Sequence, residues 1–288
     1  MQILITGATG FIGRSLTQAL TQAGIEWHAY EGRINDPISL RQQLVGINVV
    51  VHLASSEARG RTRLMQHVDL EGTERLLEEA RRANIMHLIY VSRIGANPNA
   101  LQPLLRFKGR IERRIERSGV PYTILRSATL FGRGDRSLEL ILSLALWSWP
   151  FVWLPGGGRV AMQPLWVEDL VRCLVATMRR PELRGQTLTV AGEERWRYHE
   201  LVQQILAVRE LNRIGLPVPL VLLRPFAYSF FRWWRWPAVS RFFVDRFFVP
   251  EVAETDSVLR QFAFRPARLS ESLAYLHRAG MTSRLWRH

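Results

Sequence analysis

The chain begins with a pattern typical of a buried strand, which runs directly into a glycine-rich turn. Residues Gln2–Thr6 alternate and include β-branched side chains, and residues 11–23 then follow a helical period. Three glycines stand in the turn at the spacing G-x-x-G-x-x-G: Gly7, Gly10 and Gly13. A strand, a glycine turn and an amphipathic helix in this order predict the first unit of a doubly wound parallel α/β sheet.

Each glycine has a physical role if such a turn binds a dinucleotide. Gly7 permits the tight turn, Gly10 lets the backbone approach a pyrophosphate, and Gly13 lets the helix pack closely on its strand. The pyrophosphate would then meet the exposed N–H groups at the helix N-terminus. The residues expected to bind the dinucleotide here are Gly7, Thr9, Gly10, Phe11, Ile12 and Gly13. The alternative is a tight turn without a ligand.

Length, cysteine content and hydropathy limit the class of protein. The chain has 288 residues, of which 47% are hydrophobic, enough for one large domain or a domain with a substantial lobe. The single cysteine, Cys173, excludes a disulfide framework and fits a reducing compartment. No signal peptide is expected before the first strand, and the uncharged stretch 140–158 is too short and too interrupted to span a membrane. We therefore expect a cytoplasmic protein that is not integral to a membrane.

Strand and helix patterns alternate after the first unit, as in a doubly wound sheet. Strands are expected at 25–30, 48–53, 86–92, 122–126 and 187–190, and helices at 37–45, 68–83, 108–118 and 198–208. The predicted fold class is α/β, a Rossmann-type parallel sheet with a smaller C-terminal lobe. The predicted domains are 1–192 for the nucleotide-binding sheet and 193–288 for a basic, aromatic-rich lobe.

These motifs resemble an atypical form of the extended short-chain dehydrogenase/reductase family. The matching stretches cover residues 1–208 in the right order and include TGATGFIG (6–13), VVHLA (50–54), DLEGTERLLEEAR (69–81), HLIYVSRIGA (87–96) and QPLWVEDL (163–170). The chain most resembles the branch with the nucleotide-binding accessory subunit of respiratory complex I and the photosystem II assembly factors. That resemblance implies an NAD(P)-binding accessory subunit or assembly factor of a membrane redox or photosynthetic complex.

The catalytic residues of that family do not all carry over. Active members use a Tyr-x-x-x-Lys pair, in which the lysine lowers the pKa of the tyrosine and the phenol transfers a proton. The lysine matches Lys108, the only lysine in the chain, but the tyrosine position holds Leu104. The serine that would polarise a carbonyl should follow Ser92, where the chain has Arg93 and Ile94. The resemblance therefore implies no catalytic residue and no standard dehydrogenase turnover.

The adenosine end of the cofactor leaves the choice between NAD and NADP open. Glu31 stands near the distance from Gly7 at which an acid binds a ribose diol and favours NAD, whereas Arg33 would pair with a 2′-phosphate and favour NADP. The chain has lost one βα unit of the family in this region. The resemblance implies that the cofactor, tightly bound as a structural group, is also contacted by Ile34, Leu53, Ala54, Ser92, Lys108, Ser127 and Thr129.

A second informative region, residues 216–250, interleaves aromatic side chains with arginines, and the whole chain has a net charge of +14. Trp and Phe suit the headgroup boundary of a bilayer, and Arg suits anionic lipid. The segment predicts contact with a membrane protein complex or an anionic membrane surface, which places the protein peripherally on the cytoplasmic face of a membrane. Residues 146–154, with three tryptophans, are a second candidate for such contact. The alternative is that these aromatics form a core.

Three classes of function stay open from the sequence. The first is the catalytically silent accessory subunit or assembly factor. The second is an active reductase or epimerase on a nucleotide sugar or a lipid-like or quinone-like substrate, with His52, Tyr122 or Glu168 as its acid. The third is a cofactor-sensing regulator, although no nucleic-acid-reading motif is present and nucleic-acid binding is not expected. No metal site is predicted.

Overall fold

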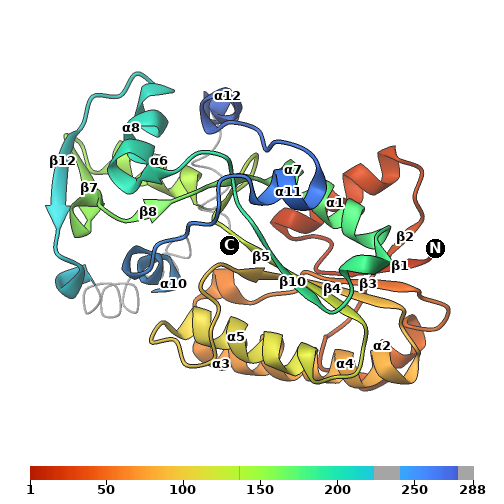
Figure 1. The fold of residues 1–288 in the computed structure, drawn as a ribbon. Coiled ribbons are helices and arrows are strands. Elements are labelled where there is room, and N and C mark those ends of the chain that lie inside the picture. Colours follow the sequence, from red (N-terminus) through yellow and green to blue (C-terminus); the bar gives the residue numbers. More distant parts are fainter. Residues whose placement is uncertain (136, 224–240, 278–288) are drawn as a thin grey trace. The chain divides into compact units, whose positions relative to one another are not determined.

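The computed structural model describes residues 1–135, 137–223 and 241–277. The chain forms two compact units (Figure 1). The first comprises Met1–Ser127 and Val167–Val190, and the second comprises Ala128–Trp166 and Ala191–His288. The predicted domain boundary at 192/193 lies close to residues 190 and 191, where the chain passes for the last time from the first unit to the second. Residues 128–166, however, belong to the second unit and not to the first, because their short strands pair within that unit.

The first unit is built on a six-stranded sheet with the order β10-β5-β4-β3-β1-β2, in which every neighbouring pair is parallel. Its strands are β1 (Ile3–Thr6), β2 (Trp27–Ala29), β3 (Val49–His52), β4 (His87–Arg93), β5 (Tyr122–Ser127) and β10 (Gln186–Val190). Its α-helices are α1 (Phe11–Gln22), α2 (Pro37–Gln43), α3 (Thr62–Leu64), α4 (Gly72–Arg82), α5 (Pro103–Glu116) and α7 (Val167–Met178). Figure 1 shows α2, α4 and α5 on one face of this sheet and α1 and α7 on the other. The predicted doubly wound parallel sheet is confirmed.

One strand, β2, lies beyond β1 in the described part of this sheet, where the usual 3-2-1-4-5-6 order has two. The chain passes from β2 into α2 through a short loop, and Asp36 caps the helix by accepting from the N–H of Ile38 at 3.0 Å. The early start of α2 agrees with the loss of a βα unit that the sequence predicts.

The second unit contains three two-stranded sheets: β11-β8, β12-β7 and β6-β9. Its strands are β6 (Leu130–Phe131), β7 (Phe151–Pro155), β8 (Ala161–Met162), β9 (Leu165–Trp166), β11 (Trp196–Arg197) and β12 (Ile214–Val218). The α-helices with described bounds in this unit are α6 (Leu138–Trp147), α8 (Tyr198–Ala207), α10 (Arg241–Asp245), α11 (Ser257–Phe262) and α12 (Leu269–Ser272). The apolar faces of α6 and α8 meet in a core that includes Phe131, Leu142 and Leu201.

The aromatic region 216–250 divides into parts with different environments. Phe242 and Phe247 are buried, as the core alternative predicts for them. Leu216 and the neighbouring residues Val221 and Leu222 are exposed. The tryptophans at 233, 234 and 236 lie outside the described residues. Among the helices that the structure describes, none has the length and apolar character needed to cross a bilayer.

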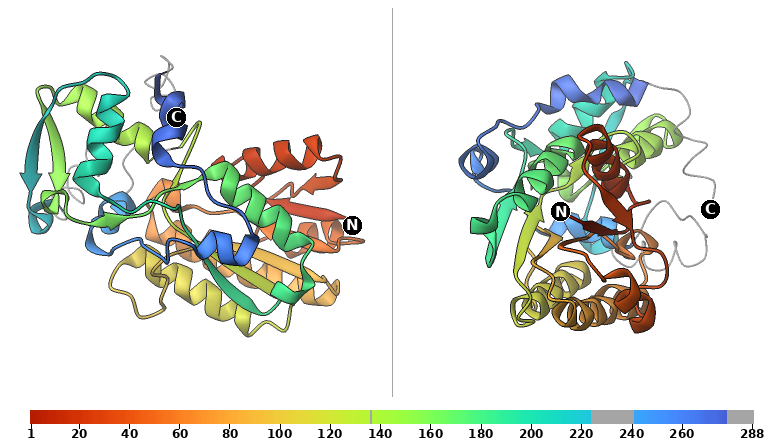
Figure 2. Two further views of the ribbon diagram at one scale, coloured as in Figure 1. Left: turned by 45° about the horizontal axis from the view of Figure 1, so that its top comes forward. Right: turned by 90° about the vertical axis from the view of Figure 1, so that its right-hand side faces the viewer.

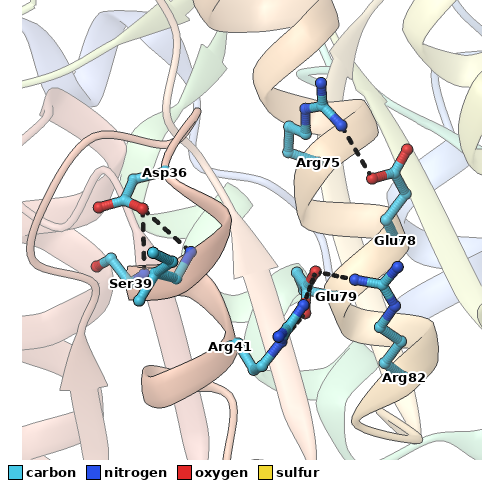
Figure 3. A network of polar contacts seen from close by, with 8 residues as sticks. Asp36, Ser39, Arg41, Arg75, Glu78, Glu79 and Arg82 are labelled. Carbon is cyan, nitrogen blue, oxygen red and sulfur yellow. Dashed lines mark hydrogen bonds and ion pairs between the residues drawn. The ribbon is translucent and has the colours of Figure 1, made fainter.

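A carboxylate network ties α2 to α4 (Figure 3). Glu79 on α4 is buried, and its two oxygens accept from Arg41 on α2, with Nε to Oε2 at 2.9 Å and Nη2 to Oε1 at 3.1 Å. Arg82 contacts the same carboxylate. The hydrogen bonds from Arg41 hold the pKa of Glu79 below its ordinary value. The neighbouring pair Arg75–Glu78, at 3.3 Å, is exposed on both sides.

We expect Glu79→Gln to lower the melting temperature at pH 7 by about 3–6 °C, since it leaves two arginines without their shared carboxylate. The matched control, Glu78→Gln, removes an exposed pair on the same helix and should shift the melting temperature by about 1 °C or less. Thermal melts of the two variants make the comparison. Equal shifts would contradict a structural role for the α2–α4 network.

Candidate functional site

The glycine turn lies at the carboxyl edge of the sheet, where β1 passes into α1. Gly7 has a φ of +75°, and a Cβ on it would lie 2.8 Å from the backbone nitrogen of Ala54, in the loop that follows β3. A Cβ on Gly13 would lie 2.2 Å from the carbonyl oxygen of Gly7. Both positions therefore require glycine, and α1 and the β3 loop pack directly on the turn.

The N-terminus of α1 has no side-chain cap. Gly10 is its N-cap residue, no side chain accepts from the first turn, and that turn contains no acidic residue. Thr9 and Gly10 are exposed, whereas Phe11 and Ile12 are half-buried. The first N–H groups of a helix have no partner within it, so an uncapped N-terminus attracts an anion. This terminus lies where the strand order reverses between β1 and β3, the position at which open α/β sheets bind their ligands.

The end of β2 presents one acidic and one basic side chain. Glu31 and Arg33 are exposed, and neither side chain makes a hydrogen bond or ion pair with another residue in the described ranges. The backbone between β2 and α2 is nevertheless fixed, since the Glu31 carbonyl accepts from Gln43 Nε2 at 2.6 Å. Ile34 differs from these two, because its side chain is buried in the core against Gly72.

A buried polar network lies beneath the switch point. The Nδ1 atom of His52 is 2.7 Å from Thr6 Oγ1, and its Nε2 atom is 2.9 Å from Thr73 Oγ1. Because Thr73 donates to the carbonyl of Asp69, its oxygen accepts from His52 Nε2–H, and Nδ1 then accepts from Thr6. The N–H of Ala54 donates to Thr6 Oγ1 at 3.3 Å, so the network also holds the β3 loop. Burial, together with the positive charge of Lys108, lowers the pKa of His52 to about 3.

Asp69 fixes the rest of the same loop. Its carboxylate is buried and accepts from Ser55 Oγ at 2.6 Å and from the N–H of Ser56 at 2.9 Å. Asp69 lies in a π-helical segment, Met65–Glu71, that precedes α4 in place of the regular helix predicted from residue 68. π-Helical turns often occur at functional sites, and this one carries the carboxylate that binds the loop.

Lys108 lies in α5 with its charge buried. Its Nζ donates to the carbonyl of Val91 at 3.5 Å and lies 5.1 Å from the centre of the Tyr90 ring. Burial by itself lowers the pKa of Lys108, but Tyr90 and the carboxylates of Glu57 and Asp69 outweigh burial, and the net shift is upward. Burial also raises the pKa of Tyr90 to about 12. The carboxylates and the phenol around Lys108 therefore offset the effect of burial and favour its charged form.

The positions that would carry a proton donor and a polarising hydroxyl hold other groups. Leu104, one helical turn before Lys108, is only 4% exposed. Arg93, directly after Ser92, forms a close ion pair with Glu57. Ser92 and Ser127 are both buried, and Ser127 Oγ donates to the carbonyl of Ser92 at 3.3 Å. The Ser92 hydroxyl has no hydrogen-bond partner among the described residues.

Most of the predicted site residues gather at the carboxyl edge of the first unit. Thr129 is an exception, because it belongs to the second unit, where its hydroxyl donates to buried Glu251. Four supporting residues were not predicted from the sequence: Thr6, Glu57, Asp69 and Thr73. Asp69 and Thr73 lie within the quoted DLEGTERLLEEAR stretch, which was their one available signal.

The three alternative acids are poorly placed. His52 is buried and both its ring nitrogens are hydrogen-bonded. Tyr122 begins β5 and so lies at the amino edge, opposite the glycine turn. Glu168 is exposed in the first turn of α7. None of the three resembles a proton donor at the carboxyl edge.

Comparison with known proteins agrees with this geometry. A family model described as NAD(P)H-binding matches residues 26–141. Photosystem II assembly factor Ycf39 of Trieres chinensis is 25% identical over 253 residues, covering 81% of this chain and 77% of that protein. NADH dehydrogenase (ubiquinone) 1 alpha subcomplex subunit 9, mitochondrial, of Arabidopsis thaliana is 28% identical over 243 residues, covering 75% of this chain and 60% of that protein.

Among solved structures, the UDP-glucose 4-epimerase of Thermus thermophilus in complex with NAD superimposes with a TM-score of 0.73 at 16% identity, covering 97% of this chain and 100% of that one. Such a likeness supports the fold. The predicted resemblance to the photosystem II assembly factors and to the complex I subunit is confirmed by these relatives.

Burial of His52 predicts how stability depends on pH. In the unfolded chain its imidazole takes up a proton below about pH 6.5, whereas the folded pKa is about 3, so stability falls as the pH drops through this window. Between pH 7 and pH 5 the histidine should account for about 2 kcal/mol of lost unfolding free energy. In urea titrations at these two pH values, we expect His52→Asn to lose about 2 kcal/mol less unfolding free energy than wild type does. His28→Asn, at an exposed histidine, should leave the loss unchanged, and an unchanged loss in His52→Asn would contradict the assignment.

Proposed function

We propose that this chain binds NAD or NADP as a tightly held structural group and acts as a catalytically silent accessory subunit or assembly factor of a membrane redox or photosynthetic complex. The observation that carries this proposal is Leu104. It is buried one helical turn before Lys108, where the resemblance implies a proton-donating tyrosine. A hydrocarbon side chain cannot donate a proton, so the geometry favours binding over turnover.

The residues at the carboxyl edge fit a dinucleotide. Gly7 and Gly13 let the β3 loop and α1 pack directly on the turn, and the uncapped N-terminus of α1 offers N–H groups to a pyrophosphate. Glu31 or Arg33 would contact the adenosine ribose or its 2′-phosphate. Leu53, Ala54, Ser92, Lys108 and Ser127 would contact the nicotinamide half, where Ser92 offers an unpaired buried hydroxyl. A bound nicotinamide supplies a hydride donor or acceptor.

The surroundings of Lys108 support a static role. Burial outweighs the lowering effect of Lys108 on the neighbouring phenol, so the pKa of Tyr90 stays raised, at about 12. The ion pair between Arg93 and Glu57 replaces the polarising hydroxyl after Ser92. These groups hold their charges in place beside Lys108.

Association with a membrane complex is supported by the relatives. One is named as a photosystem II assembly factor and another as a subunit of an NADH dehydrogenase. This chain spans 60% of the plant subunit's length. We propose a peripheral position on the cytoplasmic face of the membrane that holds the complex.

The first test is dinucleotide binding by Gly10→Val. Gly10 has an extended backbone and a Cβ there would meet only the Gly7 oxygen, at 3.1 Å, so the variant should fold. Its side chain would occupy the space for the pyrophosphate, and we expect affinity for NAD(H) and NADP(H) to fall by about 100-fold or more in calorimetry. Gln18→Val, on the exposed face of the same helix, should bind as the wild type does. Unchanged affinity in folded Gly10→Val would rule out the site.

Substitutions at the end of β2 should change selectivity in opposite directions. Arg33→Gln removes a cation that would pair with a 2′-phosphate, so we expect the ratio of NADPH to NADH affinity to fall about tenfold. Glu31→Gln removes the carboxylate that favours a ribose diol and should raise that ratio. Titration of both dinucleotides into both variants measures the ratios. If neither ratio moves, the adenosine end binds elsewhere.

Turnover separates the proposed function from an active enzyme. Purified wild-type protein should oxidise NADPH at no more than the background rate with carbonyl, quinone or sugar-nucleotide substrates, since loss of general acid catalysis removes about 10²–10⁴-fold in rate. Sustained, substrate-dependent NADPH oxidation would overturn the silent role and favour the reductase or epimerase alternative.

A further inference from the structure

Among the described residues, exposed large apolar side chains gather on the second unit, where β7 and β12 run side by side (Figures 1 and 2). The pairing is parallel and aligns Phe151 with Ile214 and Trp153 with Leu216. Side chains alternate across a strand, so these four share one face. All four are exposed, by 40%, 62%, 40% and 41% respectively. Val152, between the two aromatics of β7, is buried in the core of the unit.

Neighbouring segments extend this surface. Trp147 at the end of α6 and Trp149 before β7 are 67% and 74% exposed. Arg213 joins the two segments, since its Nε donates to the carbonyl of Ala145 in α6 at 2.8 Å while the next residue begins β12. We define the β7/β12 face as Trp147, Trp149, Phe151, Trp153, Ile214 and Leu216.

The two segments that carry this face contain basic but no acidic residues, and the nearest carboxylates in the sequence, Glu139 and Glu210, stand just before them. Residues 140–159 and 211–223 contain two arginines, Arg159 and Arg213, and no acidic residue. Exposed apolar side chains on the first unit are distributed differently, since Ile38 and Val45 lie on and just after α2, whereas Leu101 precedes α5. A large apolar patch without carboxylates is uncommon on a surface that faces only water.

We propose that the β7/β12 face enters the headgroup boundary of a lipid bilayer that contains anionic lipid. Indole rings favour this boundary because they combine an apolar body with a hydrogen-bond donor, and the two arginines complement anionic headgroups. A protein partner or a second copy of the chain would more often meet a polar rim with both signs of charge. The inference rests on the proposed membrane location, and it names lipid as the partner of this face.

The test is flotation of the full-length protein with phosphatidylcholine vesicles, with and without phosphatidylglycerol. Wild type should bind the anionic vesicles, and binding should weaken but persist in high salt, because salt screens the arginines and not the apolar term. We expect the triple variant Trp147→Ser, Trp149→Ser, Ile214→Ser to lose about tenfold or more in binding. The matched control is Ile38→Ser, Val45→Ser, Leu101→Ser, whose side chains are 67%, 76% and 82% exposed, and it should bind as wild type does.

Three results would overturn the inference. The first is wild type that fails to float with anionic vesicles. The second is a folded triple variant that floats as well as wild type, which would assign lipid contact to another part of the chain. Sedimentation could instead reveal a dimer that the triple variant loses, without vesicle binding, which would assign the face to a second copy. Calorimetry with NADPH on the same preparations distinguishes failure of the lipid inference from failure of the proposed function. Protein that binds the dinucleotide but does not float refutes only the lipid inference.

Discussion

The Cα of Gly7 lies against the backbone of Leu53 and Ala54, with no space for a side chain between them. This contact joins the turn after β1 to the loop after β3 at the point where the strand order reverses. Gly13 brings α1 onto the same turn, so the turn, the helix that follows it and the distant β3 loop meet through backbone atoms alone. The buried Thr6–His52–Thr73 network then secures the β3 loop from beneath. The open N-terminus of α1 depends on this packing for its place at the edge of the sheet.

The charges beside the turn form a second, connected layer. Lys108 is buried near the carboxylates of Asp69 and Glu57, which stabilise its ammonium. Each carboxylate also has another role, since Asp69 binds the Ser55–Ser56 backbone and Glu57 pairs with Arg93. Removing any one of these groups would leave a buried charge without compensation, which costs far more than an exposed ion pair contributes. These contacts hold the charged groups in fixed positions beside the turn.

Local sequence signals were sufficient for most of the first unit. Periodicity located the parallel strands and most helices, because a buried parallel strand and an amphipathic helix each have a strong pattern. The π-helical start at Met65 was not predictable, since hydrogen-bond register leaves little trace in hydropathy. The role of Asp69 depends on a loop that precedes it in the chain and on a tertiary contact that spacing does not encode. The placement of residues 128–166 was missed for a similar reason, because strands of two residues carry no periodic signal.

The division of the chain into interleaved units constrains the order of synthesis and folding. The chain crosses between the units after residues 127, 166 and 190. A nascent chain that has reached residue 166 therefore carries five of the six sheet strands, but neither α7 nor β10, which covers the edge of β5. The segment 128–166 emerges before α8 and β11, its later packing partners. The ribosome thus exposes an incomplete sheet edge and an unpaired apolar segment together, which makes this stage the one at which a chaperone would protect the chain.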